Sequence, residues 1–78
     1  MRLLVTGGAG FIGSRFSLMA MACWPEAQVV VLDALTYAGN RQNLSDVEND
    51  PRYTFIHGNI CDEETVARAI RGCTQVVN

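Results

Sequence analysis

The apolar and polar positions of this 78-residue chain alternate between short apolar runs and stretches of helical length. Short runs rich in apolar and β-branched residues, bounded by turn residues, are typical of buried strands. They predict strands over residues 2–6, 29–32, 53–57 and 75–77. Helices are predicted over residues 11–23 and between an N-cap at Asp62 and a stop at Gly72, with a short helical turn over residues 41–47.

Strands that alternate with helices predict a parallel sheet, because each crossover between parallel strands needs a connecting segment of this length. The predicted fold class is therefore α/β, a doubly wound parallel sheet with the spatial order 3-2-1-4. The sheet is expected to be truncated after the start of its fourth strand. The sequence contains no linker, so residues 1–78 are expected to form one N-terminal half-domain.

The first predicted helix is unusual in its composition. Residues 16–24 are apolar on nearly every side, and no charge follows Arg15 before the helix ends at Pro25. A helix that is apolar all round is usually buried on more than one side, and packing on the sheet accounts for only one of them.

A glycine-rich turn joins the first strand to this helix. Gly8, Gly10 and Gly13 fit the spacing G-x-G-x-x-G, and Gly7, Gly10 and Gly13 fit G-x-x-G-x-x-G. Glycine lets a phosphate approach the backbone, and the helix that follows offers N–H groups with no intrahelical partner. Strand, glycine turn and helix in this order predict a site for a dinucleotide pyrophosphate.

Asp33 strengthens this interpretation. It ends the second apolar strand and follows Gly13 by 20 residues, where the ribose-binding acid of a dinucleotide site is expected. The alternative is a glycine turn and a strand-end aspartate with no ligand. A Walker-type phosphate loop is excluded because it requires a lysine, and all six basic residues of the chain are arginines.

Other candidate residues have simpler explanations. Cys23, Cys61 and Cys73 are odd in number and widely spaced, which predicts reduced thiols in the core or at helix ends. His57, the only histidine, is expected to be half-buried at the end of a strand, so no metal site is predicted. Tyr37 and Arg41 have the spacing of a catalytic Tyr-x-x-x-Lys pair, but arginine is a poor substitute for lysine.

Composition narrows the function classes. The hydrophobic content of 49% is that of a globular protein, and the net charge of −2 argues against nucleic acid and anionic membranes as partners. No apolar run approaches the roughly 20 residues of a membrane span. With reduced cysteines, these features predict a cytoplasmic protein.

Four segments resemble the extended short-chain dehydrogenase/reductases, and more narrowly the dTDP-glucose 4,6-dehydratases, which have a Rossmann fold. They are residues 7–13, 31–33, 35–40 and 58–62. The stretch Leu-Thr-Tyr-Ala-Gly-Asn over residues 35–40 is the most specific of them, and it separates the chain from the nucleotide-sugar 4-epimerases.

This resemblance implies that the cofactor is NAD. The turn would be shaped by Gly7, Gly10 and Gly13, and the pyrophosphate would accept from the N–H groups of Phe11 and Ile12. Asp33 would hold the adenosine ribose. The adenosine side would be lined by Leu35, Thr36, Ala38 and Gly39, and the adenine would be bracketed by Asn59 and Ile60.

The chain departs from the family pattern in three places. Asn59 replaces a usual aspartate, although its amide oxygen can still accept from the adenine amino group. Arg15 stands where a histidine is common, and the first helix lacks the charged residues that are usual in the family.

The family's catalytic Tyr-x-x-x-Lys, its acid–base pair and its sugar-nucleotide domain all lie beyond the fourth strand. The chain therefore contains no predicted catalytic residue. It is expected to be the NAD-binding segment of a lyase, inactive alone, with dTDP-hexose bound only by a full-length parent of a usually homodimeric family. Two alternatives stay open: a stand-alone nucleotide- or partner-binding module, and a fragment of a nucleotide-sugar 4-epimerase.

Overall fold

The computed structural model describes residues 1–35 and 41–77, and it contains every helix and strand that the sequence predicts. The strands are β1 (Arg2–Thr6), β2 (Gln28–Asp33), β3 (Tyr53–His57) and β4 (Gln75–Val77). The helices are α1 (Phe11–Cys23), α2 (Glu63–Ile70) and the 3-10 helix η1 (Arg41–Val47), which is interrupted by non-helical backbone at Leu44.

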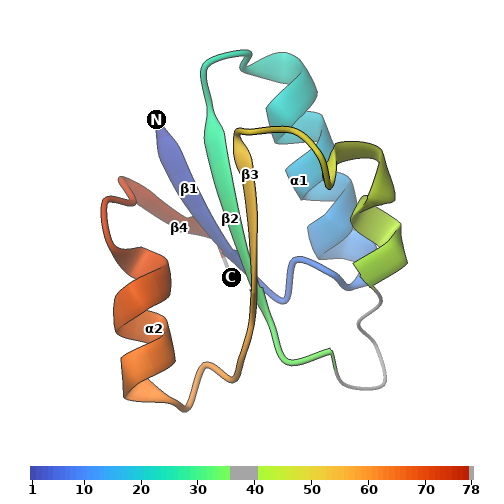
Figure 1. The fold of residues 1–78 in the computed structure, drawn as a ribbon. Helices are drawn as coiled ribbons and strands as arrows, with labels where there is room; N and C mark the ends of the chain where they lie inside the picture. Colours follow the sequence, from blue (N-terminus) through green and yellow to red (C-terminus); the bar gives the residue numbers. More distant parts are fainter. Residues whose placement is uncertain (36–40, 78) are drawn as a thin grey trace.

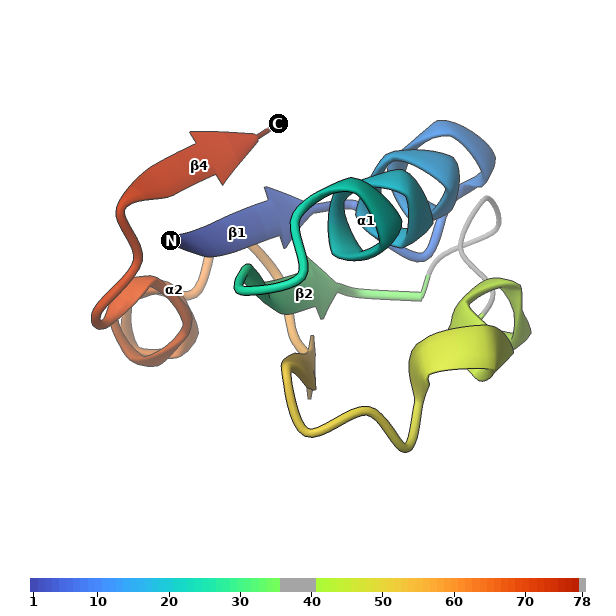
Figure 2. The ribbon, with the colours of Figure 1, turned by 90° about the horizontal axis from the view of Figure 1, so that it is seen from above.

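The four strands form one parallel sheet in the order β3-β2-β1-β4, which confirms the predicted topology. In the register of this sheet Val5 pairs with Val31 of β2 on one side and with Val77 of β4 on the other. Helix α1 and η1 lie on one face of the sheet, and α2 lies on the other (Figures 1 and 2). The fold is a Rossmann-type α/β arrangement.

The two faces of the sheet build two separate apolar clusters, because successive side chains of a strand point to opposite faces. The cluster under α1 and η1 consists of Leu3, Val5, Ala9, Ala20, Met21, Val29, Val31 and Leu44. The cluster under α2 consists of Leu4, Val30, Leu32 and Ala69. The two central strands are therefore buried on both faces, which explains why they are continuous apolar runs.

Helix α1 contacts the sheet on one side and η1 on another, where Leu44 is fully buried. This accounts for more of its apolar surface than the sheet alone, as predicted. Its burial is nevertheless incomplete, since Phe11, Ile12 and Met19 are between 51% and 77% exposed. No helix within residues 1–35 and 41–77 is long and apolar enough to cross a membrane.

Two expectations about single residues need correction. Cys23 at the end of α1 and Cys73, which follows α2 and packs partly buried against the cluster under α2, fit the prediction, but Cys61 is exposed in the loop before α2. His57 is exposed rather than half-buried, because β3 is the outer strand of the described sheet. Its Nε2 lies 3.0 Å from the carbonyl oxygen of Ala34.

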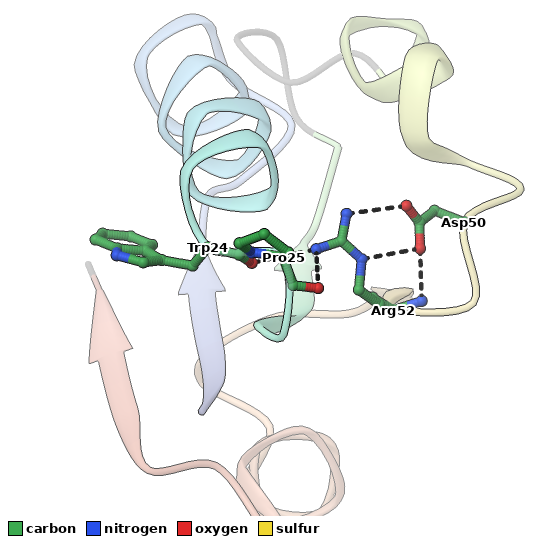
Figure 3. Close-up of polar contacts among 4 residues, drawn as sticks. All are labelled: Trp24, Pro25, Asp50 and Arg52. Carbon is green, nitrogen blue, oxygen red and sulfur yellow. Dashed lines mark hydrogen bonds and ion pairs between the residues drawn. The ribbon is translucent and has the colours of Figure 1, made fainter.

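Arg52 connects the start of β3 to the end of α1 (Figure 3). Its Nη1 donates to the carbonyl oxygens of Trp24 and Pro25 at 3.2 and 2.8 Å, and its Nη2 lies 3.1 Å from Oδ2 of Asp50. A cationic donor at a helix C-terminus is favoured by the helix dipole. The hydrogen bond from the Arg52 side chain also holds the pKa of Asp50 below its usual value.

The N-cap of α2 gives a testable prediction. Oδ1 of Asp62 accepts from the backbone N–H groups of Glu64 and Thr65, and Oδ2 accepts from the Thr65 hydroxyl at 2.9 Å. The hydroxyl bond is the main reason why the pKa of Asp62 is lowered. Because the folded pKa lies below the unfolded one, this stabilisation is complete above the unfolded pKa and is lost as the pH falls through the folded pKa.

We expect Asp62→Ala to lower the urea midpoint at pH 7. Asp62→Asn keeps a good N-cap, so we expect it to retain most of the stability at pH 7 but to lose this pH dependence. Urea denaturation at pH 7 and near pH 3 measures both effects. Asp46→Ala on η1 is the control, since it removes the same charge without removing a cap. Equal midpoints for Asp62→Ala and Asp46→Ala would contradict the prediction.

Candidate functional site

The glycine turn is anchored to the end of β2. The N–H of Gly7 donates to the carbonyl oxygen of Leu32 at 2.9 Å, and the N–H of Gly10 donates back to the carbonyl oxygen of Gly7 at 3.1 Å. Gly7 has a φ of +68°, which side-chain-bearing residues rarely adopt. A Cβ on Gly13 would collide with the carbonyl oxygen of Gly7. Gly7 and Gly13 are thus the positions where the turn itself requires glycine.

Gly8, which belongs to the other spacing, is needed for packing. A Cβ built on it would lie 2.6 Å from the Val31 side chain of β2. The glycines therefore have different physical reasons: Gly7 and Gly13 are needed by the turn itself, and Gly8 lets the turn lie against the sheet.

The N-terminus of α1 leaves backbone donors available. Gly10 is the N-cap and provides no side-chain cap, and the first turn carries no acidic residue. The N–H groups of Phe11, Ile12 and Gly13 precede the first intrahelical bond, which runs from Ser14 to Gly10. Phe11 and Ile12 are 68% and 77% exposed. This helix end can accept an anion.

Asp33 has a structural role that the sequence did not predict. The residue is 8% exposed; Oδ2 accepts from the N–H of Ala9 at 2.8 Å, and Oδ1 accepts from the N–H of Leu35 at 2.7 Å. The side chain therefore joins the glycine turn to the segment after β2. Each carboxylate oxygen has a further lone pair, so Asp33 can still accept from a ligand hydroxyl.

Leu35 itself is held in an uncommon conformation. Its φ of +55° lies in the left-handed region, where a leucine costs free energy unless neighbouring contacts fix it. The bond to Asp33 and packing against the α1 cluster provide those contacts. The predicted site residues that follow Leu35, namely Thr36, Ala38 and Gly39, lie outside the described residues, as does Tyr37.

Two cavities flank the glycine turn at the carboxyl ends of the strands. The first has a volume of about 220 Å³ and is lined by Thr6, Gly7, Leu32, Asp33, Ala34, Gly58, Asn59 and Ile60. The second has a volume of about 340 Å³ and is lined by Val5, Thr6, Gly7, Ile12, Gly13, Phe16 and Val77. They lie on the two sides of β1, where the strand order reverses and open α/β sheets bind their ligands.

Asn59 and Ile60 line the first cavity, in the loop after β3. Oδ1 of Asn59 accepts from the N–H of Cys61 at 2.8 Å, so part of its accepting capacity is used within the loop. Gly58 was not assigned a role from the sequence, yet a Cβ there would collide with the Thr65 side chain. Its position directly after a predicted strand was the available signal.

Among the described residues, no three side chains of the His, Cys, Asp or Glu type are grouped so that they could hold a metal ion. The arrangement at the ends of the strands instead combines backbone donors, a buried carboxylate and two hollows. Those are the elements that recognise a dinucleotide.

Comparison with known proteins agrees with this geometry. The family model described as GDP-mannose 4,6 dehydratase matches residues 4–78. The chain belongs to this family. It is 50% identical over 78 residues to the dTDP-glucose 4,6-dehydratase of Mycobacterium tuberculosis, which covers all of this chain and 23% of the relative. The chain thus spans about a quarter of the length of the curated relatives that it matches.

Solved structures of a dehydratase and an epimerase have the same fold. The dTDP-glucose 4,6-dehydratase of Bacillus anthracis, solved in complex with NAD, superposes with a TM-score of 0.96 at 38% identity, covering 100% of this chain and 26% of that one. The UDP-glucose 4-epimerase of Thermus thermophilus, also solved with NAD, gives a TM-score of 0.71 at 41% identity, covering 91% of this chain and 20% of that one.

The steric role of Gly13 is testable. We expect Gly13→Ala to destabilise the chain by about 1–3 kcal/mol, because the new Cβ meets backbone atoms of Gly7 and Gly8 that cannot move independently. Gly7→Asn is the contrasting variant. No atom lies within 4 Å of a Cβ at Gly7, and asparagine tolerates a positive φ.

Urea denaturation of both variants checks this prediction. The steric account requires a clearly larger loss for Gly13→Ala than for Gly7→Asn. The opposite order would show that backbone conformation, rather than close approach, limits the turn.

Proposed function

We propose that residues 1–78 are the NAD-binding half-domain of a dTDP-glucose 4,6-dehydratase. The observation that carries the proposal is the glycine turn between two cavities, with the Asp33 carboxylate in the wall of one and the N-terminal turn of α1 beside the other. The sequence identity to the M. tuberculosis dehydratase and the TM-score to the B. anthracis dehydratase support this assignment.

The residues present fit NAD in three separate ways. The unpaired N–H groups at the start of α1 suit a pyrophosphate. The remaining lone pairs of Asp33 suit the hydroxyls of the adenosine ribose, and Asn59 and Ile60 line the same cavity and suit the adenine. The second cavity, beside Ile12 and Phe16, is left for the nicotinamide half.

When bound, NAD supplies hydride transfer, and the protein supplies binding and orientation. Val5, Thr6, Ile12, Phe16 and Val77, which line the second cavity with two glycines, carry no group that titrates near neutral pH. General acid–base catalysis needs such a group within reach of the substrate. We therefore assign cofactor binding to these residues, and we assign catalysis on the hexose to other parts of a full-length enzyme.

A 4-epimerase would hold NAD with the same elements. The dehydratase structures superpose with TM-scores of 0.84 to 0.96 and the epimerases with 0.69 to 0.80, which favours the dehydratase. The sequence of residues 35–40 favours it as well. Use of a dTDP-hexose by the full-length parent, assembly as a homodimer and location in the cytoplasm belong to the same proposal.

Asp33 predicts the choice between NAD and NADP. A carboxylate that accepts from the 2′-hydroxyl repels a 2′-phosphate, so we expect NADP to bind at least about tenfold more weakly than NAD. Asp33→Asn removes the charge and keeps one acceptor oxygen, which can satisfy the N–H of Ala9 or that of Leu35 but not both. We expect it to narrow the difference between the two cofactors, mainly by weakening NAD binding.

Isothermal titration of the purified chain with each cofactor measures both dissociation constants. Asp46→Asn, which makes the same substitution on the exposed side of η1, is the control. If the unmodified chain bound NAD and NADP equally well, Asp33 would not be the ribose residue.

A further inference from the structure

We infer that Asn43 is a positioning residue for the glycine turn. Its Nδ2 donates to the carbonyl oxygen of Ala9 at 2.9 Å, across 34 residues of sequence. Neither the glycine pattern nor the resemblance assigns Asn43 a role. The inference rests on the proposed function in one respect, since it takes the turn to be the pyrophosphate site.

The Ala9 residue is fixed at both of its backbone polar groups. Its N–H donates to Oδ2 of Asp33 at 2.8 Å, and its carbonyl oxygen accepts from Asn43. Ala9 is completely buried, so water cannot replace either partner without opening the turn. Two side chains from different elements, the end of β2 and η1, therefore hold one residue between them.

Planarity of the peptide bond transmits this constraint to the helix. The carbonyl group of Ala9 and the N–H of Gly10 belong to the same rigid plane, so fixing one fixes the direction of the other. The Gly10 N–H then closes the turn onto the carbonyl oxygen of Gly7 at 3.1 Å. Gly10 is also the N-cap of α1, so the orientation of this peptide plane helps to set the direction in which the first helical N–H groups, those of Phe11 and Ile12, point.

Asn43 can act as an anchor because its own segment is anchored. Its neighbour Leu44 is fully buried in the α1 cluster, which holds η1 against α1. On a loosely held loop, the entropy lost by ordering the asparagine side chain and the loop would cancel the free energy gained from the hydrogen bond. Here apolar packing already holds η1 in place, so the hydrogen bond from Asn43 can fix the orientation of the turn.

The test compares Asn43→Asp and Asn43→Ala with Asn49→Asp. A carboxylate has nearly the shape of the amide but no N–H to donate, and alanine removes the donor without adding charge. Asn49→Asp makes the same chemical change at an exposed position beyond η1, so it is matched in charge and in residue type.

Two measurements are made on the purified chain. Amide hydrogen exchange without any ligand reports on the turn alone, and isothermal titration with NAD reports on binding. We expect both Asn43 variants to raise exchange at Ala9 and Gly10 by about three- to tenfold and the dissociation constant of NAD by a similar factor. The Gly58 amide, bonded to the Asp33 carbonyl at the end of β2, should be unchanged. Asn49→Asp should alter none of these values.

The two readouts separate this inference from the proposed function. Failure of the unmodified chain to bind NAD would contradict the proposed function, whatever the exchange rates. Unchanged exchange at Ala9 and Gly10 in both variants, or an equal change in Asn49→Asp, would overturn the role of Asn43. A rise in exchange across all of β1 and β2 would also overturn it, because the residue would then support the whole fold rather than the turn.

Discussion

The constraint on which this site depends is the buried carboxylate of Asp33. Asp33 is 8% exposed, so its carboxylate needs hydrogen-bond donors, and two backbone N–H groups, those of Ala9 and Leu35, provide them. One donor belongs to the glycine turn and the other to the segment after β2. Satisfying one side chain thus brings together the two loops between which a cofactor would lie.

The rest of the arrangement follows from that junction. The turn can lie against the sheet because Gly8 leaves room for Val31, and α1 can start where it does because Gly13 leaves room for the Gly7 carbonyl. The helix then begins just beyond the carboxyl end of β1, where the N–H groups of its first turn precede the first intrahelical bond. Because both faces of the sheet are buried, the strands form a packed scaffold, and the polar groups suited to ligand binding lie on the loops that follow them.

Much of this fold is predictable from the sequence. The strands and helices follow from apolar periodicity, the topology follows from their alternation, and the turn follows from glycine spacing in front of a helix. Asp62 was predictable as an N-cap because capping depends on residues only two or three positions away. Gly7 and Gly13 were predictable for the same reason, since the turn that needs them is local.

Contacts between distant segments were not predictable. The bonds from Asn43 to Ala9 and from Ala9 to Asp33 join elements 34 and 24 residues apart, and no local pattern encodes them. The exposure of His57, in contrast, was within reach of the sequence, because the predicted order 3-2-1-4 already makes β3 the outer strand of the described sheet. The exposed Phe11 and Met19 show that an apolar helix can keep part of its surface uncovered here.

The most direct test of this account is a titration of the isotopically labelled chain with NAD, followed through its backbone amide resonances. The account predicts shifts that concentrate on residues 7–13, Asp33 and residues 58–60. The chain has another cavity of about 350 Å³ at the amino ends of the strands, lined by Met1 and residues 24–27. Shifts confined to that region, or no shifts at millimolar NAD, would contradict the account.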